Sequence, residues 1–162
     1  MELRRKLQDG YHNSFNVVNL EHKKYKKLDI IMDYIESQTD IDYVDLEGFT
    51  CGYNFMQSEL LLNKKQLFQL AIKDCEHSSI SVIAHEIGHY LDSTARYNYY
   101  EEYTETRNIK VIINQEISAW KYAADVIKEL YPNDRSIHFE FMKSYEANLN
   151  TYIEAYEDRY TI

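Results

Sequence analysis

The spacing of apolar residues near the start of the chain predicts an amphipathic helix from about Lys23 to Ser37. Apolar residues recur there at the intervals that one buried helical face requires; they are Tyr25, Leu28, Ile31, Met32 and Ile35. Between Ile41 and Lys64 the pattern changes to short apolar stretches, which are broken by Gly48 and Gly52. Such stretches predict two or three short strands in a small sheet.

Helical periodicity returns at Ser78 and persists over most of the C-terminal half of the chain. It is interrupted around Ser93 to Tyr100 and again at Pro132-Asn133-Asp134. The last apolar stripe, from about Ser136 to Glu157, predicts a helix that docks on the core through Phe141, Met142, Tyr145, Leu149, Tyr152, Ile153 and Tyr156. One proline and four glycines also favour long helices over turn-dense β structure. We therefore expect an α+β fold dominated by helices.

Length, charge and cysteine content narrow the class of protein. A chain of 162 residues is close to the common size of one domain, so we expect 1–162 to form a single domain. The formal net charge of -9 would repel phosphate backbones, so we expect no nucleic-acid partner.

No apolar stretch approaches the length of a membrane span, and the first residues lack the apolar core of a secretory signal. We expect Cys51 and Cys75 to be free thiols in a reducing, cytoplasmic compartment.

The segment His85-Glu86-Ile87-Gly88-His89 matches the H-E-x-x-H pattern of metal-dependent hydrolases. On a helix, the two histidines project from one face and can share a metal ion, and the glutamate between them can act as a base. A helical wheel places apolar residues on one side, namely Ile80, Ile83, Ala84, Ile87, Tyr90 and Leu91. The opposite side carries Ser78, Val82, His85, Glu86, His89 and Asp92. This division predicts that the histidines face a cleft while the apolar side packs on the core.

A catalytic zinc ion needs a third protein ligand, and Glu116 is the best candidate. It is the one charged residue in an apolar helical stripe that comprises Ile112, Ile113, Ala119, Trp120, Ala123, Ile127 and Leu130. A buried carboxylate needs a compensating charge, and a divalent metal supplies it. The small residues Ala119 and Ala123 would let this helix approach the motif helix closely. The competing third ligands are Glu101, Glu102 and Glu105.

Two features near the motif have alternative interpretations. Asp92 lies on the histidine face, where it could orient a ligand histidine, bind the metal directly, or serve as a solvated or capping carboxylate. Trp120 is expected to pack in the core beside Glu116, and its ring could also form a wall of a substrate pocket.

The motif from His85 to His89, followed by Glu116-Ile-Ser-Ala119-Trp120, resembles the gluzincin metallopeptidases, especially their small phage-associated or ImmA-like members. The resemblance covers roughly Leu60 to Ala124 and implies a zincin-like fold, with a small, mostly antiparallel sheet beside the active-site helix. It also implies that zinc is bound by the two histidines and Glu116. The metzincin pattern needs a glycine and a third histidine further on, where this chain has Asp92 and Ala95, so that family is rejected.

These residues predict a zinc peptidase with a protein or peptide substrate. Zinc would lower the pKa of a bound water toward about 7, Glu86 would take the proton, and the hydroxide would attack a peptide carbonyl. The oxyanion that develops could be stabilised by Tyr97, Tyr99, Tyr100, Tyr103 or His138. Two alternatives stay open, a zincin-fold binding or regulatory module that cleaves nothing, and a metal-dependent hydrolase with a non-peptide substrate.

Overall fold

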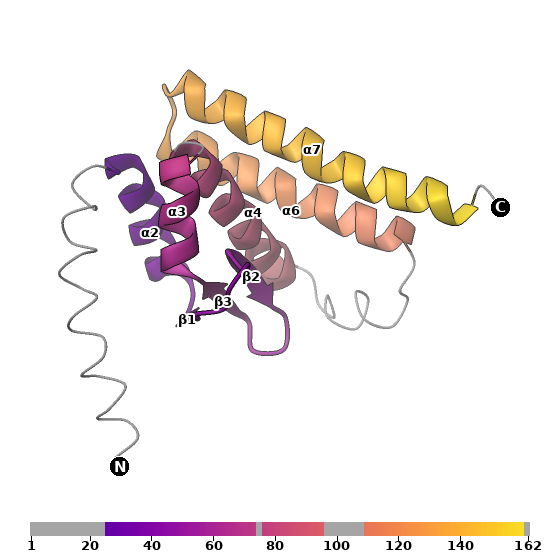
Figure 1. The fold of residues 1–162 in the computed structure, drawn as a ribbon, viewed down its shortest axis with the longest axis horizontal. Coiled ribbons are helices and arrows are strands. Elements are labelled where there is room, and N and C mark those ends of the chain that lie inside the picture. Colours follow the sequence, from indigo (N-terminus) through magenta and orange to yellow (C-terminus); the bar gives the residue numbers. More distant parts are fainter. Residues whose placement is uncertain (1–24, 74–75, 96–108, 161–162) are drawn as a thin grey trace, which may run out of the picture.

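Helices dominate the computed structural model, which describes residues 25–73, 76–95 and 109–160 (Figure 1). Within these ranges lie five helices and three strands. In chain order they are α2 (Lys26–Gln38), β1 (Ile41–Tyr43), β2 (Cys51–Asn54), β3 (Glu59–Leu62), α3 (Lys64–Lys73), α4 (Glu76–Ala95), α6 (Ile109–Leu130) and α7 (Arg135–Tyr160). The expectation of a helix-dominated α+β fold is therefore confirmed.

The small sheet is mixed, with strand order β1-β3-β2. Strands β2 and β3 pair antiparallel, because a tight turn that includes Ser58 in a left-handed conformation joins them directly. Strand β1 pairs parallel with β3, with Ile41 opposite Leu60. The expectation of a mostly antiparallel sheet is wrong, because one of the two strand pairs is parallel. A strand of three residues is too short for its apolar pattern to indicate its direction in the sheet.

Helix α4 is the centre of the fold, because it contacts α2, α3, α6, α7 and the strands β2 and β3. The apolar side that the helical wheel predicted is fully buried at Ile80, Ile83, Ala84 and Ile87. It packs in one core cluster with residues from α2 and β3, which include Leu28, Ile31, Ile35, Leu60 and Leu62. The motif is thus carried by a helix whose position is set by the whole core.

Helix α6 packs directly on α4, and the two backbones lie very close together at Gly88. A Cβ atom at this position would lie 2.1 Å from the carbonyl oxygen of Ala119 and 3.2 Å from the backbone nitrogen of Ala123. Both alanines are fully buried. The close approach predicted from Ala119 and Ala123 is confirmed, and Gly88 is the partner on α4 that makes it possible.

Helix α3 was not predicted, although its first turn carries a sequence signal. The Oδ1 atom of Asn63 accepts a hydrogen bond from the backbone N–H of Gln66 at 3.1 Å, which caps the start of the helix. Leu67, Phe68 and Ala71 form its buried face. Because these apolar residues follow β3 closely in the sequence, only the capping residue Asn63 indicates that a helix begins here.

Helix α7 runs beside α6 along one edge of the molecule (Figure 1). Its first turn is capped by Asp134, whose Oδ1 accepts hydrogen bonds from the backbone N–H groups of Ser136 and Ile137 at 3.1 and 3.2 Å. Ile137 and Phe141 are buried, which confirms the predicted docking. Met142 and Ile153 are 47% and 38% exposed, so their predicted place in the docking seam is wrong.

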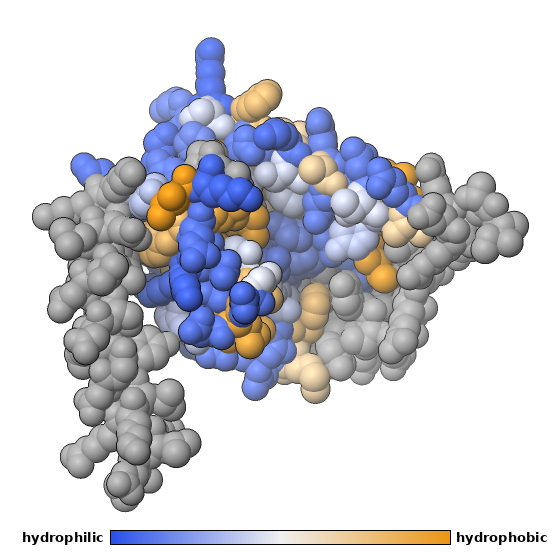
Figure 2. Space-filling view, viewed as in Figure 1, coloured by the Kyte–Doolittle hydropathy of each residue, from blue (hydrophilic) through white to orange (hydrophobic). Residues whose placement is uncertain are grey.

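The outer surface is mostly hydrophilic on the face drawn in Figure 2, where small hydrophobic groups are separated by hydrophilic residues. None of the described helices combines the length and apolar character that a membrane crossing requires.

Candidate metal centre

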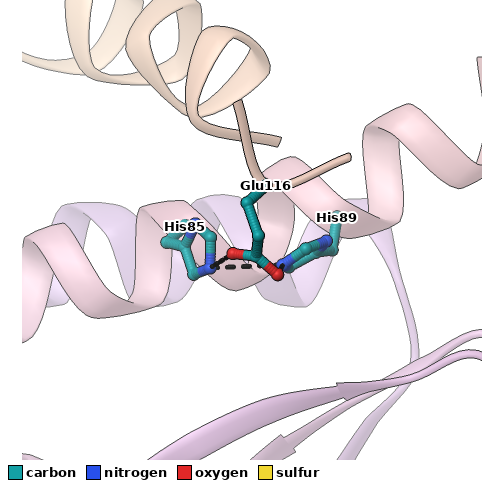
Figure 3. Close-up of side chains that lie close together, drawn as sticks. All are labelled: His85, His89 and Glu116. Carbon is teal, nitrogen blue, oxygen red and sulfur yellow. Dashed lines mark hydrogen bonds and ion pairs between the residues drawn. The ribbon is translucent and has the colours of Figure 1, made fainter. Parts of the chain in front are cut away.

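Two histidines from α4 and one glutamate from α6 meet between these helices (Figure 3). The Nε2 atoms of His85 and His89 are 3.2 Å apart. Glu116 places Oε2 3.2 Å from His85 Nε2 and Oε1 3.5 Å from His89 Nε2. The structure therefore brings together the three residues predicted from the sequence, and this buried cluster could hold a metal ion.

The separations of these atoms fit a common divalent ion. Zinc–nitrogen and zinc–oxygen bonds of about 2.0–2.2 Å, at tetrahedral angles, place two donors about 3.3–3.5 Å apart. The two histidine nitrogens are 3.2 Å apart, and Glu116 approaches each of them with a different oxygen, at 3.2 and 3.5 Å. One donor atom from each residue lies within 4.8 Å of the other two. Two imidazole nitrogens and a carboxylate also form a donor set that leaves a fourth position open. The residues present thus fit a metal ion that keeps one position for water.

Burial and nearby charge shift the pKa of Glu116, which is 3% exposed, in opposite directions. Burial raises the pKa of its carboxyl, but hydrogen bonds with His85 and His89 and the charges of these rings outweigh it and lower the pKa to about 2. For His89 the signs are reversed. Burial lowers the pKa of its ring, but the hydrogen bond with Glu116 and the charges of nearby carboxylates outweigh burial, so the pKa of His89 is raised. Glu116 is consequently ionised at neutral pH, which is the state that binds a cation.

Aromatic side chains hold the two histidine rings. The His85 ring stacks on Trp120, with centroids 4.3 Å apart and the planes 26° from parallel. The His89 ring meets Phe55 edge to face at 5.9 Å. Trp120 is 5% exposed, packs against Phe141 in the core and also borders the cavity beside the histidines. Both roles considered for Trp120, core packing and pocket wall, therefore apply.

A cavity of about 400 Å³ opens beside the cluster and is bordered by α4, α6, α7 and β2. Besides the three clustered residues, its lining comprises Tyr53, Phe55, Val82, Glu86, Trp120, Ser144, Asn148 and Tyr152. The predicted cleft on the histidine face of α4 is therefore present. Its residues from β2 and α7 were not predicted as parts of the site, because the sequence does not show which elements lie opposite the motif.

Glu86 borders this cavity and is partly exposed. Within the described part of the chain its carboxylate forms no hydrogen bond or ion pair. The charge of Glu86 acts on two neighbours: it adds to burial in raising the pKa of Cys51, and it helps to raise the pKa of His89. The Cys51 side chain is a free thiol, as expected. Among the described residues, the Glu86 carboxylate therefore has no hydrogen-bond or ion-pair partner, and it borders the same cavity as His85, His89 and Glu116.

Asp92 is buried, at 1% exposure, so the solvated role considered for it is wrong. Its Oδ1 accepts a hydrogen bond from Ser118 Oγ at 3.1 Å, which adds a polar contact between α4 and α6. Its charge helps to raise the pKa of His89. Asp92 is not part of the three-residue cluster. Its position therefore favours an electrostatic effect on His89 over direct binding of a metal ion.

Several other candidates lie away from the site or outside the described residues. His138 hydrogen-bonds through Nε2 to the carbonyl oxygen of Tyr131 at 2.8 Å. Tyr131 follows the end of α6, about 22 Å along the helix from Glu116, so His138 is not placed to stabilise an oxyanion. The candidates that fall outside the described ranges are Cys75, Tyr97, Tyr99, Tyr100, Glu101, Glu102, Tyr103 and Glu105.

Comparisons with models of protein families, with curated proteins and with solved structures find no match. The function must therefore be argued from the geometry and chemistry of the residues that surround the cavity.

Proposed function

We propose that the protein is a zinc-dependent peptidase related to the gluzincins. His85, His89 and Glu116 hold the zinc ion, and Glu86 is the general base. One observation carries the proposal: the free carboxylate of Glu86 borders the same cavity as the three clustered donors. Two histidines and one glutamate form the ligand set of known catalytic zinc sites, which keep a position for water.

The proposed chemistry is hydrolysis of a peptide bond. When bound, zinc supplies a Lewis acid that activates water toward a peptide carbonyl. Glu86 takes one proton from that water and later delivers it to the amine that leaves. The Trp120 stack and the Phe55 contact keep both imidazole rings in place during these steps. Each residue thus has a role that follows from its position around the cavity.

A module that binds zinc without catalysis is the competing function. Structural zinc sites usually complete their ligand shell with four protein ligands. In the described part of the chain the cluster has three, and Glu86 has no structural contact that would explain an acid at this place. These two features favour the enzyme.

The test compares wild-type protein with Glu86→Gln, measuring bound zinc by mass spectrometry and cleavage of a broad peptide library. We expect equal zinc content, with cleavage reduced at least about hundredfold in the variant because the base is lost. Glu129→Gln, an exposed change on α6, is the matched control and should behave as wild type. Zinc binding without any cleavage would favour the silent module, and equal cleavage by both proteins would refute the role of Glu86.

A further inference from the structure

The wall of the cavity on α7 is made of polar side chains that face the site at regular intervals. Ser144, Asn148 and Tyr152 are spaced four residues apart and all border the cavity, so they form one stripe along the helix. None of these residues belongs to the three-residue cluster or is adjacent to it in sequence. Helix α7 therefore contributes a surface to the cavity that the proposed chemistry does not use.

Trp120 fixes the orientation of the Asn148 amide. The indole Nε1 of Trp120 donates a hydrogen bond to Asn148 Oδ1 at 3.1 Å. An indole N–H is a donor only, so the asparagine atom that faces it must be the oxygen. The amide nitrogen, with its two hydrogens, is left with no partner among the described residues. Because Trp120 is itself held by its stack on His85, the amide is aimed by the same ring that supports a metal ligand.

The remaining lining shows which acceptor suits this donor. The described lining residues include no lysine or arginine, and Glu86 adds a negative charge. Apart from the proposed metal ion, a free carboxylate or a phosphate would meet no cationic side chain among these lining residues, whereas a neutral carbonyl requires only an N–H donor. The aromatic and apolar residues Tyr53, Phe55 and Val82 supply surface for the side chain of a bound peptide.

We propose that Asn148 is a substrate-binding residue whose amide N–H donates to a backbone carbonyl of a peptide segment in the cavity. Helix α7 is then a recognition wall of the cavity that the metal-ligand helices also border. The stripe selects neutral backbone carbonyls, so the substrate is an internal stretch of a polypeptide and not its charged C-terminus. This inference rests on the proposed function, because it places the peptide beside the metal centre.

The experiment measures the affinity of zinc-loaded protein for two hydroxamates by calorimetry. Both probes bind zinc through the same group, but N-acetyl-phenylalanine hydroxamate carries a further amide carbonyl and octanohydroxamate does not. Asn148→Asp keeps an oxygen for the Trp120 N–H and removes both amide donors. We expect this change to weaken the peptide-like probe about tenfold, as for the loss of a hydrogen bond together with repulsion of the carbonyl. Octanohydroxamate, which lacks this carbonyl, should lose less affinity than the peptide-like probe, and the affinity for zinc should not fall, because the new carboxylate attracts a cation.

A second variant separates binding from structure. Asn148→Ala removes the amide donors without adding a charge and leaves the Trp120 ring over His85, so the peptide-like probe should weaken by about threefold and octanohydroxamate should not. Thermal unfolding of each variant shows that it is folded. Unchanged affinity for the peptide-like probe in Asn148→Asp, or equal losses for both probes, would overturn the inference. Wild type that binds octanohydroxamate but not the peptide-like probe would refute the inference alone, whereas failure to bind zinc would refute the proposed function as well.

Discussion

The contact between α4 and α6 differs in kind from the contacts that α7 makes with these two helices. At Gly88 the backbones of α4 and α6 approach each other directly, with no side chain between them. Helix α7 instead reaches the site through long side chains, such as Phe141 against Trp120 and Asn148 bonded to the indole. Backbone contact leaves little freedom of movement, whereas long side chains can repack.

This difference separates two properties of the site. The distances among His85, His89 and Glu116 depend on how closely α6 lies on α4, because the ligands come from these two helices. One wall of the cavity depends on α7, whose later half has exposed apolar residues such as Ile153. Changes on α7 should therefore alter recognition without altering metal binding. Changes between α4 and α6 should alter both.

The largest effect is expected from Glu116→Gln, which removes the anionic donor that α6 contributes. Zinc affinity should fall by more than about a hundredfold, since even residues that only support a ligand typically cost up to that amount. Competition with a chromophoric chelator measures the affinity. Glu129→Gln, exposed on the same helix, serves as the control and should bind zinc as wild type does. Tight zinc binding by Glu116→Gln would show that α6 supplies no ligand.

Gly88→Ala tests the backbone contact itself. Alanine normally favours a helix over glycine by about 1 kcal/mol, but here its Cβ would meet the Ala119 carbonyl oxygen. We expect the free energy of unfolding to fall by about 3 kcal/mol, with weaker zinc binding as α6 moves away. Urea titration and chelator competition measure the two effects. Thr94→Ala, exposed on the same helix, should change stability by less than about 0.5 kcal/mol, and a stabilised Gly88→Ala protein would contradict the close contact.

Ile137→Ala tests the opposite side of the comparison, because it weakens the docking of α7. Ile137 is fully buried, so its truncation should lower the free energy of unfolding by about 2–3 kcal/mol. Zinc affinity of the folded protein should stay within about twofold. Phe139→Ala, at an exposed position of the same helix, should have little effect on stability. A loss of zinc affinity in Ile137→Ala that matches the loss in Gly88→Ala would remove the distinction between the two contacts.

The smallest effect concerns the cap of α7 and depends on pH. The Lys27 ammonium, 2.6 Å from Asp134, and the hydrogen bond from Ser136 hold the pKa of the Asp134 carboxyl well below its usual value. The ionised form therefore stabilises the folded protein at pH values above the ordinary pKa of about 3.9, and this contribution is lost as the pH falls below it.

Asp134→Asn isolates this charge, because asparagine is also a good helix cap. At pH 7 the variant should be less stable than wild type by less than about 1 kcal/mol, as for an ion pair that is open to solvent. The difference should shrink as the pH is lowered from about 5 to about 3. Urea titrations over this range measure it, and a difference that does not vary with pH would exclude the ion pair as its source.

Periodicity in the sequence was sufficient to predict α2, α4, α6 and α7 and the ligand candidates, but it did not predict α3. His85 and His89 lie one helical turn apart and must share a face of any helix that contains them. Glu116 was identifiable because a charge in an apolar stripe requires a partner. The burial of Ile80, Ile83 and Ile87 follows from the same rule. These features depend on local geometry, which is why the order of residues alone decides them.

The arrangement of the elements relative to one another was decided by the tertiary structure. The direction of β1, the stack of Trp120 on His85 and the place of Asn148 in the cavity each join segments that are distant in the chain. Such contacts depend on how several helices pack at once, and packing depends on the volumes of all the side chains between them. The sequence by itself determined which residues can bind a metal, and the packing of α4, α6 and α7 decided what surrounds them.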